Sequence, residues 1–156
     1  MLIVISKLVR ADHEEVGGVI REGFRGIGKD GVEVQVLATR SPQRFAGRAW
    51  VEPPRRRSRA PETRWLVEIV MPARPPEDGY PLEWRYPHLK TAPTFVAQNW
   101  RDQLFAVAAH EAYHIKQFRM GKRRSEIAAE RWAHRALERT RLEGKGPRIV
   151  CRLPTS

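Results

Sequence analysis

The sequence predicts a single α+β domain, with strands in its N-terminal half and helices in its C-terminal half. Short apolar runs of strand type, such as VEVQVLA at 32–38, recur before residue 72. Between residues 95 and 143, apolar residues instead recur at the spacing of one helix face. With 156 residues, the chain is long enough for one core that buries about 70% of the unfolded surface.

Residues 1–71 are predicted to form a strand, a helix and three further strands. The first strand is the apolar run at 2–5. A helix follows at 12–24, where Asp12 is suited to be the N-cap. The segment TRSPQR resembles a hairpin connection between the second and third strands. The three strands after the helix are expected at 32–38, 45–51 and 65–71.

Residues 72–94 are predicted to be an irregular crossover, because six prolines fall between residues 72 and 93. Two helices follow, within residues 95–143. The first, at 95–120, is expected to end at Gly121 in the left-handed conformation. The second, at 126–143, begins after Ser125, a good N-cap. The tail, 144–156, is either a short strand or loose.

The net charge of +11 favours anionic partners, nucleic acid among them. The basic residues cluster in two segments, which are either solvated loops or contacts to nucleic acid, and no base-reading module accompanies them. These candidates are Arg55, Arg56, Arg57, Arg59, Lys122, Arg123 and Arg124.

The cellular compartment is predicted from what the sequence lacks. The single cysteine excludes a disulfide framework. No apolar run is long enough for a membrane span, and the first residues do not resemble a signal peptide. An intracellular protein is therefore expected, and nothing in the sequence indicates its oligomeric state.

The motif HEAYH at 110–114 lies inside the first C-terminal helix. His110 and His114 are four residues apart, so both imidazoles face the same side and reach one zinc ion at ~2.0–2.1 Å. Glu111 lies about 100° further round, where it can act as general base on a zinc-bound water. This pattern is typical of zinc hydrolases. The alternative is an ordinary histidine pair in a helix.

A third ligand is available on the following helix. Glu126, Glu130 and His134 lie roughly along one face at a spacing of four residues, unless they are only an exposed polar stripe. In a simple antiparallel hairpin, Glu130 would be level with His114. Glu126 reaches the site if the first helix ends soon after Phe118 or if the second helix crosses steeply.

HEAYH followed by EIAAE at 126–130 resembles the gluzincin metallopeptidases, whose signature is HExxH followed by ExxxD. Minigluzincins are similar in size. The resemblance implies a minimal zincin-like domain with one Zn²⁺ per chain, held by His110, His114 and Glu126. It further implies that Glu111 is the general base and that Glu130, in place of the family's aspartate, bonds a ligand histidine. A peptide or protein substrate would lie along a strand edge, for which 65–71 is the candidate unless it is an interior core strand.

The expected function is therefore that of a zinc metallopeptidase. The alternative is a basic nucleic-acid-associated protein with a structural or vestigial zinc site. A DNA-linked protease of Spartan type is also open, although its third ligand is a histidine, offered here only by His134. Gln117 and Arg119 are expected only at the rim of the site. The oxyanion donor is left open among the arginines, Tyr80, Tyr86, His88 and Tyr113, of which Tyr113 is expected to pack.

Overall fold

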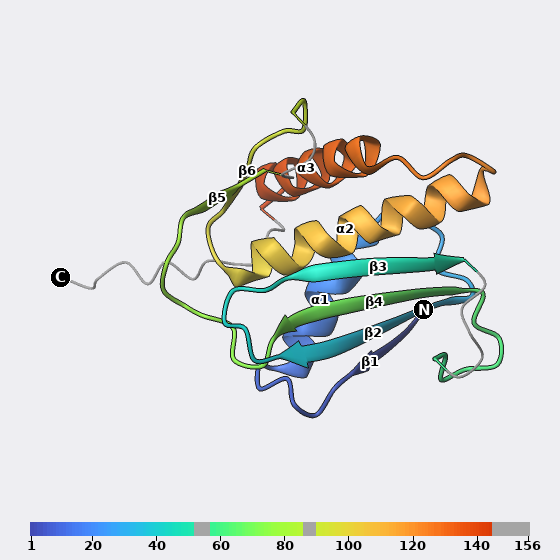
Figure 1. Cartoon of the computed structure of the whole chain (residues 1–156), viewed down its shortest axis with the longest axis horizontal. Helices are drawn as coiled ribbons and strands as arrows, with labels where there is room; N and C mark the ends of the chain where they lie inside the picture. The colour runs from blue at the N-terminus through green and yellow to red at the C-terminus, as the bar shows by residue number, and fades with distance from the viewer. Residues whose placement is uncertain (52–56, 86–89, 145–156) are drawn as a thin grey trace.

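The computed structural model describes residues 1–51, 57–85 and 90–144 and confirms the α+β fold (Figure 1). Of the predicted tail, only residue 144 lies within the described ranges. None of the described helices is long and apolar enough to cross a membrane. In chain order the elements are β1 (Leu2–Ile5), α1 (His13–Gly23), β2 (Val32–Thr39), β3 (Ala46–Val51), β4 (Trp65–Pro72), β5 (Leu82–Trp84), β6 (Phe95–Ala97), α2 (Trp100–Arg119) and α3 (Glu126–Leu142).

The main sheet has the strand order β1-β2-β4-β3. β1, β2 and β4 are parallel, and β3 runs antiparallel to β4. Two predictions are therefore wrong: β2 and β3 do not form a hairpin, and the strand at 65–71 is not an edge. β2 and β4 lie in the centre of the sheet. Even their residues on the face away from the helices, Glu33 and Leu66, are buried, as is typical of central parallel strands. β3, with exposed Arg48 and Val51, is one edge strand of the sheet, and β1 is the other.

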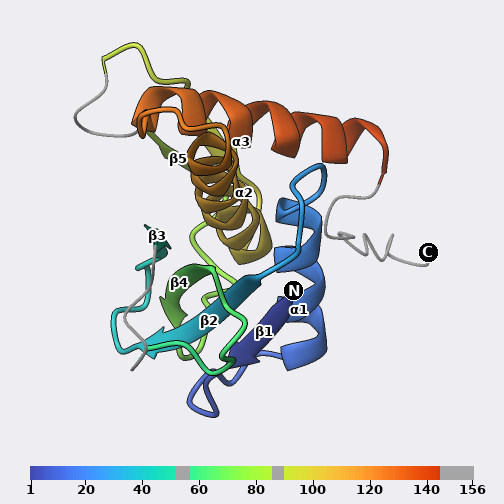
Figure 2. The same ribbon diagram turned by 90° about the vertical axis from the view of Figure 1, so that its right-hand side faces the viewer.

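α1 and α2 cover one face of this sheet (Figure 2). The core between the layers contains fully buried side chains from both, among them Ile20 of α1 and Ile69 of β4. The two helices approach closely at Gly23, where an added Cβ would lie 2.7 Å from the Cβ of Ala108. The small residues that precede HEAYH therefore allow α2 to pack against α1.

The segment between β4 and α2 contains more regular structure than predicted. β5 and β6 pair antiparallel as a separate small sheet, so residues 72–94 are not wholly irregular. α2 begins at Trp100, not at residue 95, because Asn99 caps it by accepting a hydrogen bond from the Asp102 backbone at 3.1 Å. The preceding strand is held by Phe95, whose ring stacks on Trp84 at 4.8 Å.

The turn between α2 and α3 sets the position of the second helix. α2 ends at Arg119, and Gly121 follows with φ +65°, as the sequence predicts. Ser125 caps α3 by accepting from the backbone N–H of Ala128 at 3.3 Å. Figures 1 and 2 together show α3 crossing over α2 instead of running back beside it. This crossing brings the first turn of α3 to the C-terminal half of α2.

Candidate metal centre

His110, His114 and Glu126 bring their ligand atoms to one point between α2 and α3. The two Nε2 atoms lie 3.0 Å apart. Glu126 Oε2 lies 2.9 Å from Nε2 of His110, and Oε1 lies 3.4 Å from Nε2 of His114. One ligand atom from each residue thus falls within 4.8 Å of the others. Tetrahedral zinc, with bonds of ~2.0–2.1 Å, separates two nitrogen ligands by roughly 3.3 Å, so the spacing fits this ion.

Gln117 determines which nitrogen of His114 faces the centre. Its amide oxygen lies 2.8 Å from Nδ1 of His114, and because that oxygen can only accept, Nδ1 carries the hydrogen. The orientation of the amide is fixed by Ser125, whose backbone N–H donates to the same oxygen and whose carbonyl accepts from the amide nitrogen, each at 3.3 Å. Nε2 of His114 therefore presents a lone pair to the point where the ligand atoms of His110, His114 and Glu126 meet. These three residues are called the ligand group below.

Glu130 orients the other imidazole. Its Oε1 accepts from Nδ1 of His110 at 2.6 Å, which turns Nε2 of His110 towards His114. Two ring nitrogens that face each other at 3.0 Å need a proton or a metal cation between them. Burial lowers the pKa of His110, but its hydrogen bonds with Glu126 and Glu130 outweigh burial and raise the pKa to about 9. The centre is thus built to hold positive charge.

Glu126 supplies the negative charge of the group. Its hydrogen bond with His110 lowers its pKa, burial opposes this, and a bond from Arg124 Nε at 2.7 Å lowers it further, to about 2. The carboxylate is therefore ionised across the physiological range. Two imidazoles and one carboxylate form a donor set that suits zinc better than the oxygen-seeking magnesium or calcium ions.

Glu111 lies beside this group in a buried position with 4% of its surface exposed. Burial raises its pKa to about 7, partly offset by His110. Among the described residues, its Oε2 has no hydrogen-bond partner. The edge strand β3 packs directly on it: a Cβ added to Gly47 would lie 2.6 Å from Cγ of Glu111. Only glycine lets the strand come this close.

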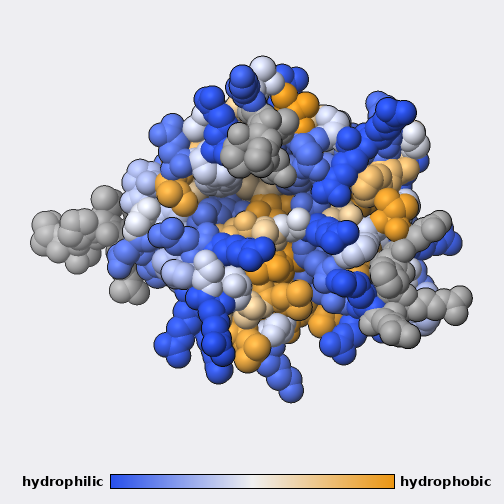
Figure 3. All heavy atoms as spheres, viewed as in Figure 1, coloured by the Kyte–Doolittle hydropathy of each residue, from blue (hydrophilic) through white to orange (hydrophobic). Residues whose placement is uncertain are grey.

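A cleft of about 280 Å³ opens over these residues. In Figure 3, drawn in the orientation of Figure 1, apolar side chains in the middle of this face are bordered by strongly hydrophilic ones. The cleft walls come from β3, α2, α3 and the β5–β6 sheet. The lining residues are Phe45, Ala46, Gly47, Trp84, Arg85, Phe95, Ala106, Val107, His110, Glu111, Arg124, Glu126 and Glu130.

His134 and the two tyrosine candidates that are described lie apart from the ligand group. The imidazole of His134 packs edge-on against Phe95, with ring centroids 5.4 Å apart. Tyr113 stacks on Trp132 at 5.2 Å, as expected of a packing residue. Tyr80 donates a hydrogen bond to Gln103 and does not line the cleft. Tyr86 and His88 fall outside the described residues.

The predicted basic candidates are not gathered into one surface by any contact among the described residues. Arg57 pairs with Glu68 at 3.1 Å, and the backbone N–H of Arg59 donates to Glu33. Arg124 is engaged by Glu126, as described above. Lys122 and Arg123 are exposed in the turn before α3. Arg55 and Arg56 fall outside the described residues.

The predictions from the sequence do not include the roles of Gln117 and Gly47. Gln117 is buried and contacts a proposed ligand, so it does not merely line a rim. Its position three residues after His114 places both on one helix face, and that spacing was a usable signal. Gly47 offered no such signal, because its role depends on the contact of β3 with α2.

Comparisons with protein-family models, with curated proteins and with solved structures find no match to this chain. The zinc site and the peptidase activity that the resemblance to gluzincins implies therefore stay predictions. The geometry of the ligand group makes them testable.

Proposed function

We propose that this protein is a zinc-dependent metallopeptidase of gluzincin type that holds one Zn²⁺ per chain. His110, His114 and Glu126 would hold the ion. The observation that carries the proposal is the convergence of their ligand atoms within 4.8 Å, with the imidazoles oriented by Glu130 and Gln117. Such second-layer hydrogen bonds are characteristic of metal-binding histidines.

The chemistry of the proposal divides between the ion and Glu111. Zinc would lower the pKa of a coordinated water and polarise the scissile carbonyl. Glu111 lines the same cleft as His110 and Glu126 and would take a proton from the attacking water. It would then return that proton to the leaving amine. Burial raises the pKa of Glu111, and a raised pKa suits a carboxylate that must both accept and donate a proton near neutral pH.

The substrate would be a peptide or protein segment in extended form. β3 pairs with β4 on one side and has no second strand partner among the described residues. Ala46 and Gly47, at its start, line the cleft beside Glu111. A peptide that adds to this edge would gain main-chain hydrogen bonds with little dependence on its sequence. β3 thus replaces β4 as the proposed substrate edge.

The proposal is tested by the Glu111→Gln variant. It keeps the three ligands, so we expect unchanged zinc content and a loss of cleavage of roughly 10²–10⁴-fold. Cleavage is measured on a degenerate peptide library by mass spectrometry, and zinc by elemental analysis of the same sample. Glu138→Gln, at an exposed position of α3, makes the same chemical change away from the cleft and should cleave like wild type. A zinc-loaded Glu111→Gln variant as active as wild type would refute the mechanism.

A further inference from the structure

Three arginines follow the carboxyl ends of the three parallel strands. Arg40 comes directly after β2, Arg74 two residues after β4, and Arg10 lies in the connection from β1 to α1. Ligands of sheets with parallel strands commonly bind outside the carboxyl ends of those strands. The position of this end of the sheet and its positive charge therefore both favour the binding of an anion.

The backbones that carry the three arginines are linked to one another. The N–H of Ala73 donates to the carbonyl of Thr39 at 3.0 Å, and the N–H of Arg10 donates to the carbonyl of Ala73 at 2.7 Å. Ala73 thus joins the end of β2 to the connection that carries Arg10. The backbone segments that carry the three arginines are therefore held together and are not independent loops.

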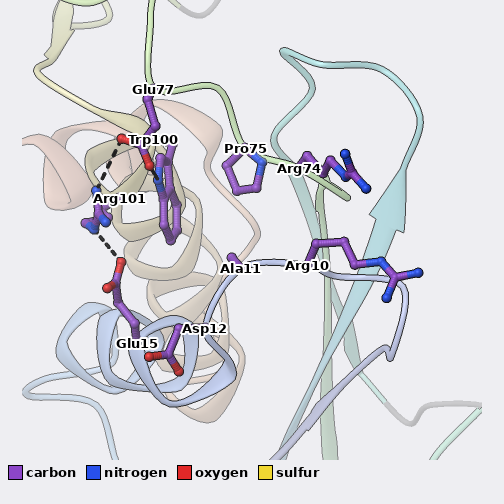
Figure 4. A pocket seen from close by; sticks show the side chains of 9 residues that line it. All are labelled: Arg10, Ala11, Asp12, Glu15, Arg74, Pro75, Glu77, Trp100 and Arg101. Atoms are coloured by element: carbon purple, nitrogen blue, oxygen red, sulfur yellow. Dashed lines mark hydrogen bonds and ion pairs between the residues drawn. The ribbon is translucent and has the colours of Figure 1, made fainter.

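A hollow of about 560 Å³ lies among these side chains, and none of the described residues that line it is acidic. A second hollow, of about 540 Å³, shares Arg10 and Arg74 and does contain acidic side chains (Figure 4). Figure 4 shows that Arg10 and Arg74 extend in the same direction, away from these acids. The first hollow is lined by Leu8, Arg10, Ala38, Thr39, Arg40, Pro42, Pro72, Ala73 and Arg74.

The nearby acids are already engaged elsewhere. Glu15 pairs with Arg101, and Glu77 accepts from the indole N–H of Trp100 at 3.2 Å. Asp12 caps α1 by accepting from the backbone of Glu14. Within the described part of the chain, Arg10, Arg40 and Arg74 make no ion pair within 4.0 Å. Their charges are therefore not offset, unlike those of Arg57 and Arg124.

We propose that Arg10, Arg40 and Arg74 bind the phosphate backbone of nucleic acid. The guanidinium group matches phosphate oxygens in a two-pronged geometry, and a net charge of +11 attracts a polyanion. The described residues of the lining include no aromatic ring on which a base would stack, so the surface recognises the backbone and not the sequence. This surface shares no lining residue with the metal cleft.

The test measures binding of a short fluorescein-labelled DNA duplex by anisotropy over a series of salt concentrations. Each lost phosphate contact lowers the slope of log affinity against log salt by ~0.9, so the combined variant R10Q/R40Q/R74Q should lose about 2.7. The loss should be the same for duplexes of unrelated sequence. The control R131Q/R135Q/R139Q removes the same charge from exposed positions of α3 and should retain the slope.

Three outcomes would overturn the proposal: no salt-dependent DNA binding by the unmodified protein, equal losses in both variants, or binding to phosphatidylserine vesicles without binding to DNA. If the combined variant does not fold by circular dichroism, R40Q alone should lower the slope by ~0.9. Zinc content should be unchanged in every variant, so failure of this proposal leaves the metal centre untouched.

Discussion

The amide oxygen of Gln117 lies 2.8 Å from Nδ1 of His114. The same oxygen also accepts the backbone N–H of Ser125, the residue that caps α3 immediately before Glu126. The main-chain carbonyl of Gln117 also accepts a hydrogen bond from the backbone N–H of Lys122 in the turn. One side chain thus connects the tautomer of one proposed ligand to the position of another.

Gln117→Ala should raise the zinc dissociation constant about 10–100-fold, because His114 loses the partner that fixes its tautomer. Gln117→Glu keeps an acceptor for Nδ1 and should bind zinc more tightly than the alanine variant. Affinity is measured by competition with a chromophoric chelator. Lys122→Ala, which removes an exposed side chain from the same turn, serves as control. Wild-type affinity in Gln117→Ala would show that Gln117 does not position His114.

Gly47→Ala should impair both stability and cleavage. Its Cβ would stand 2.6 Å from Cγ of Glu111 and 2.8 Å from Cγ1 of Val107, so β3 or the glutamate must shift. Overpacking of this kind costs about 1–3 kcal/mol of unfolding free energy. A displacement of the base by ~1 Å lowers the cleavage rate about 10²-fold.

The matched control is Gly18→Ala in α1, where an added Cβ meets no atom within 4 Å. In a helix this change should stabilise the protein by roughly 0.5–1 kcal/mol. Urea unfolding and peptide cleavage are measured on both variants. If Gly47→Ala unfolds and cleaves like wild type, β3 does not pack on Glu111 as described.

Glu33 should make stability depend on pH. Burial alone would raise its pKa, but hydrogen bonds from Gln35, Thr63 and the backbone of Arg59 and Ala60 outweigh burial and lower it below 4.5. A lowered folded-state pKa means that the stabilisation is complete above the unfolded value and is lost as pH falls through the folded value. The same hydrogen bonds to the Glu33 carboxylate connect the loop after residue 57 to β2.

Glu33→Gln should therefore lose about 2 kcal/mol of unfolding free energy near neutral pH and less in acid. Urea melts of wild type and variant are compared at neutral pH and well below 4.5, with a chelator present to remove the effect of metal. A difference between the two proteins that stays constant over this range would contradict the role of the charge.

Local signals account for the elements that sequence analysis placed well. Asp12 and Ser125 cap their helices, and Gly121 adopts the left-handed conformation after α2. Strand order was harder to predict, because the pairing of β2 with β4 joins segments that are distant in the sequence. The sequence pattern predicts a helix from residue 95, but Phe95–Ala97 form the short strand β6, and Asn99 is the N-cap of α2.

Helix periodicity predicts the part of the site that lies on α2. His110 and His114 share a face because they are four residues apart, and this follows from the sequence alone. The choice between Glu126 and Glu130 depended on how the two helices cross, which is a tertiary property. The structure brings Glu126 to both Nε2 atoms and Glu130 to Nδ1 of His110. Gly47 could not be predicted, because it acts through the packing of β3 on α2.

Zinc stoichiometry tests the central claim most directly. Purified wild-type protein, reconstituted with zinc and freed of excess by gel filtration, is compared with Glu126→Ala and Glu130→Ala by elemental analysis. We expect one zinc per wild-type chain, none in Glu126→Ala, and weakened but detectable binding in Glu130→Ala, because Glu130 only orients His110. A wild-type protein that is folded but holds no zinc, or a Glu126→Ala variant that retains it fully, would contradict the proposed centre.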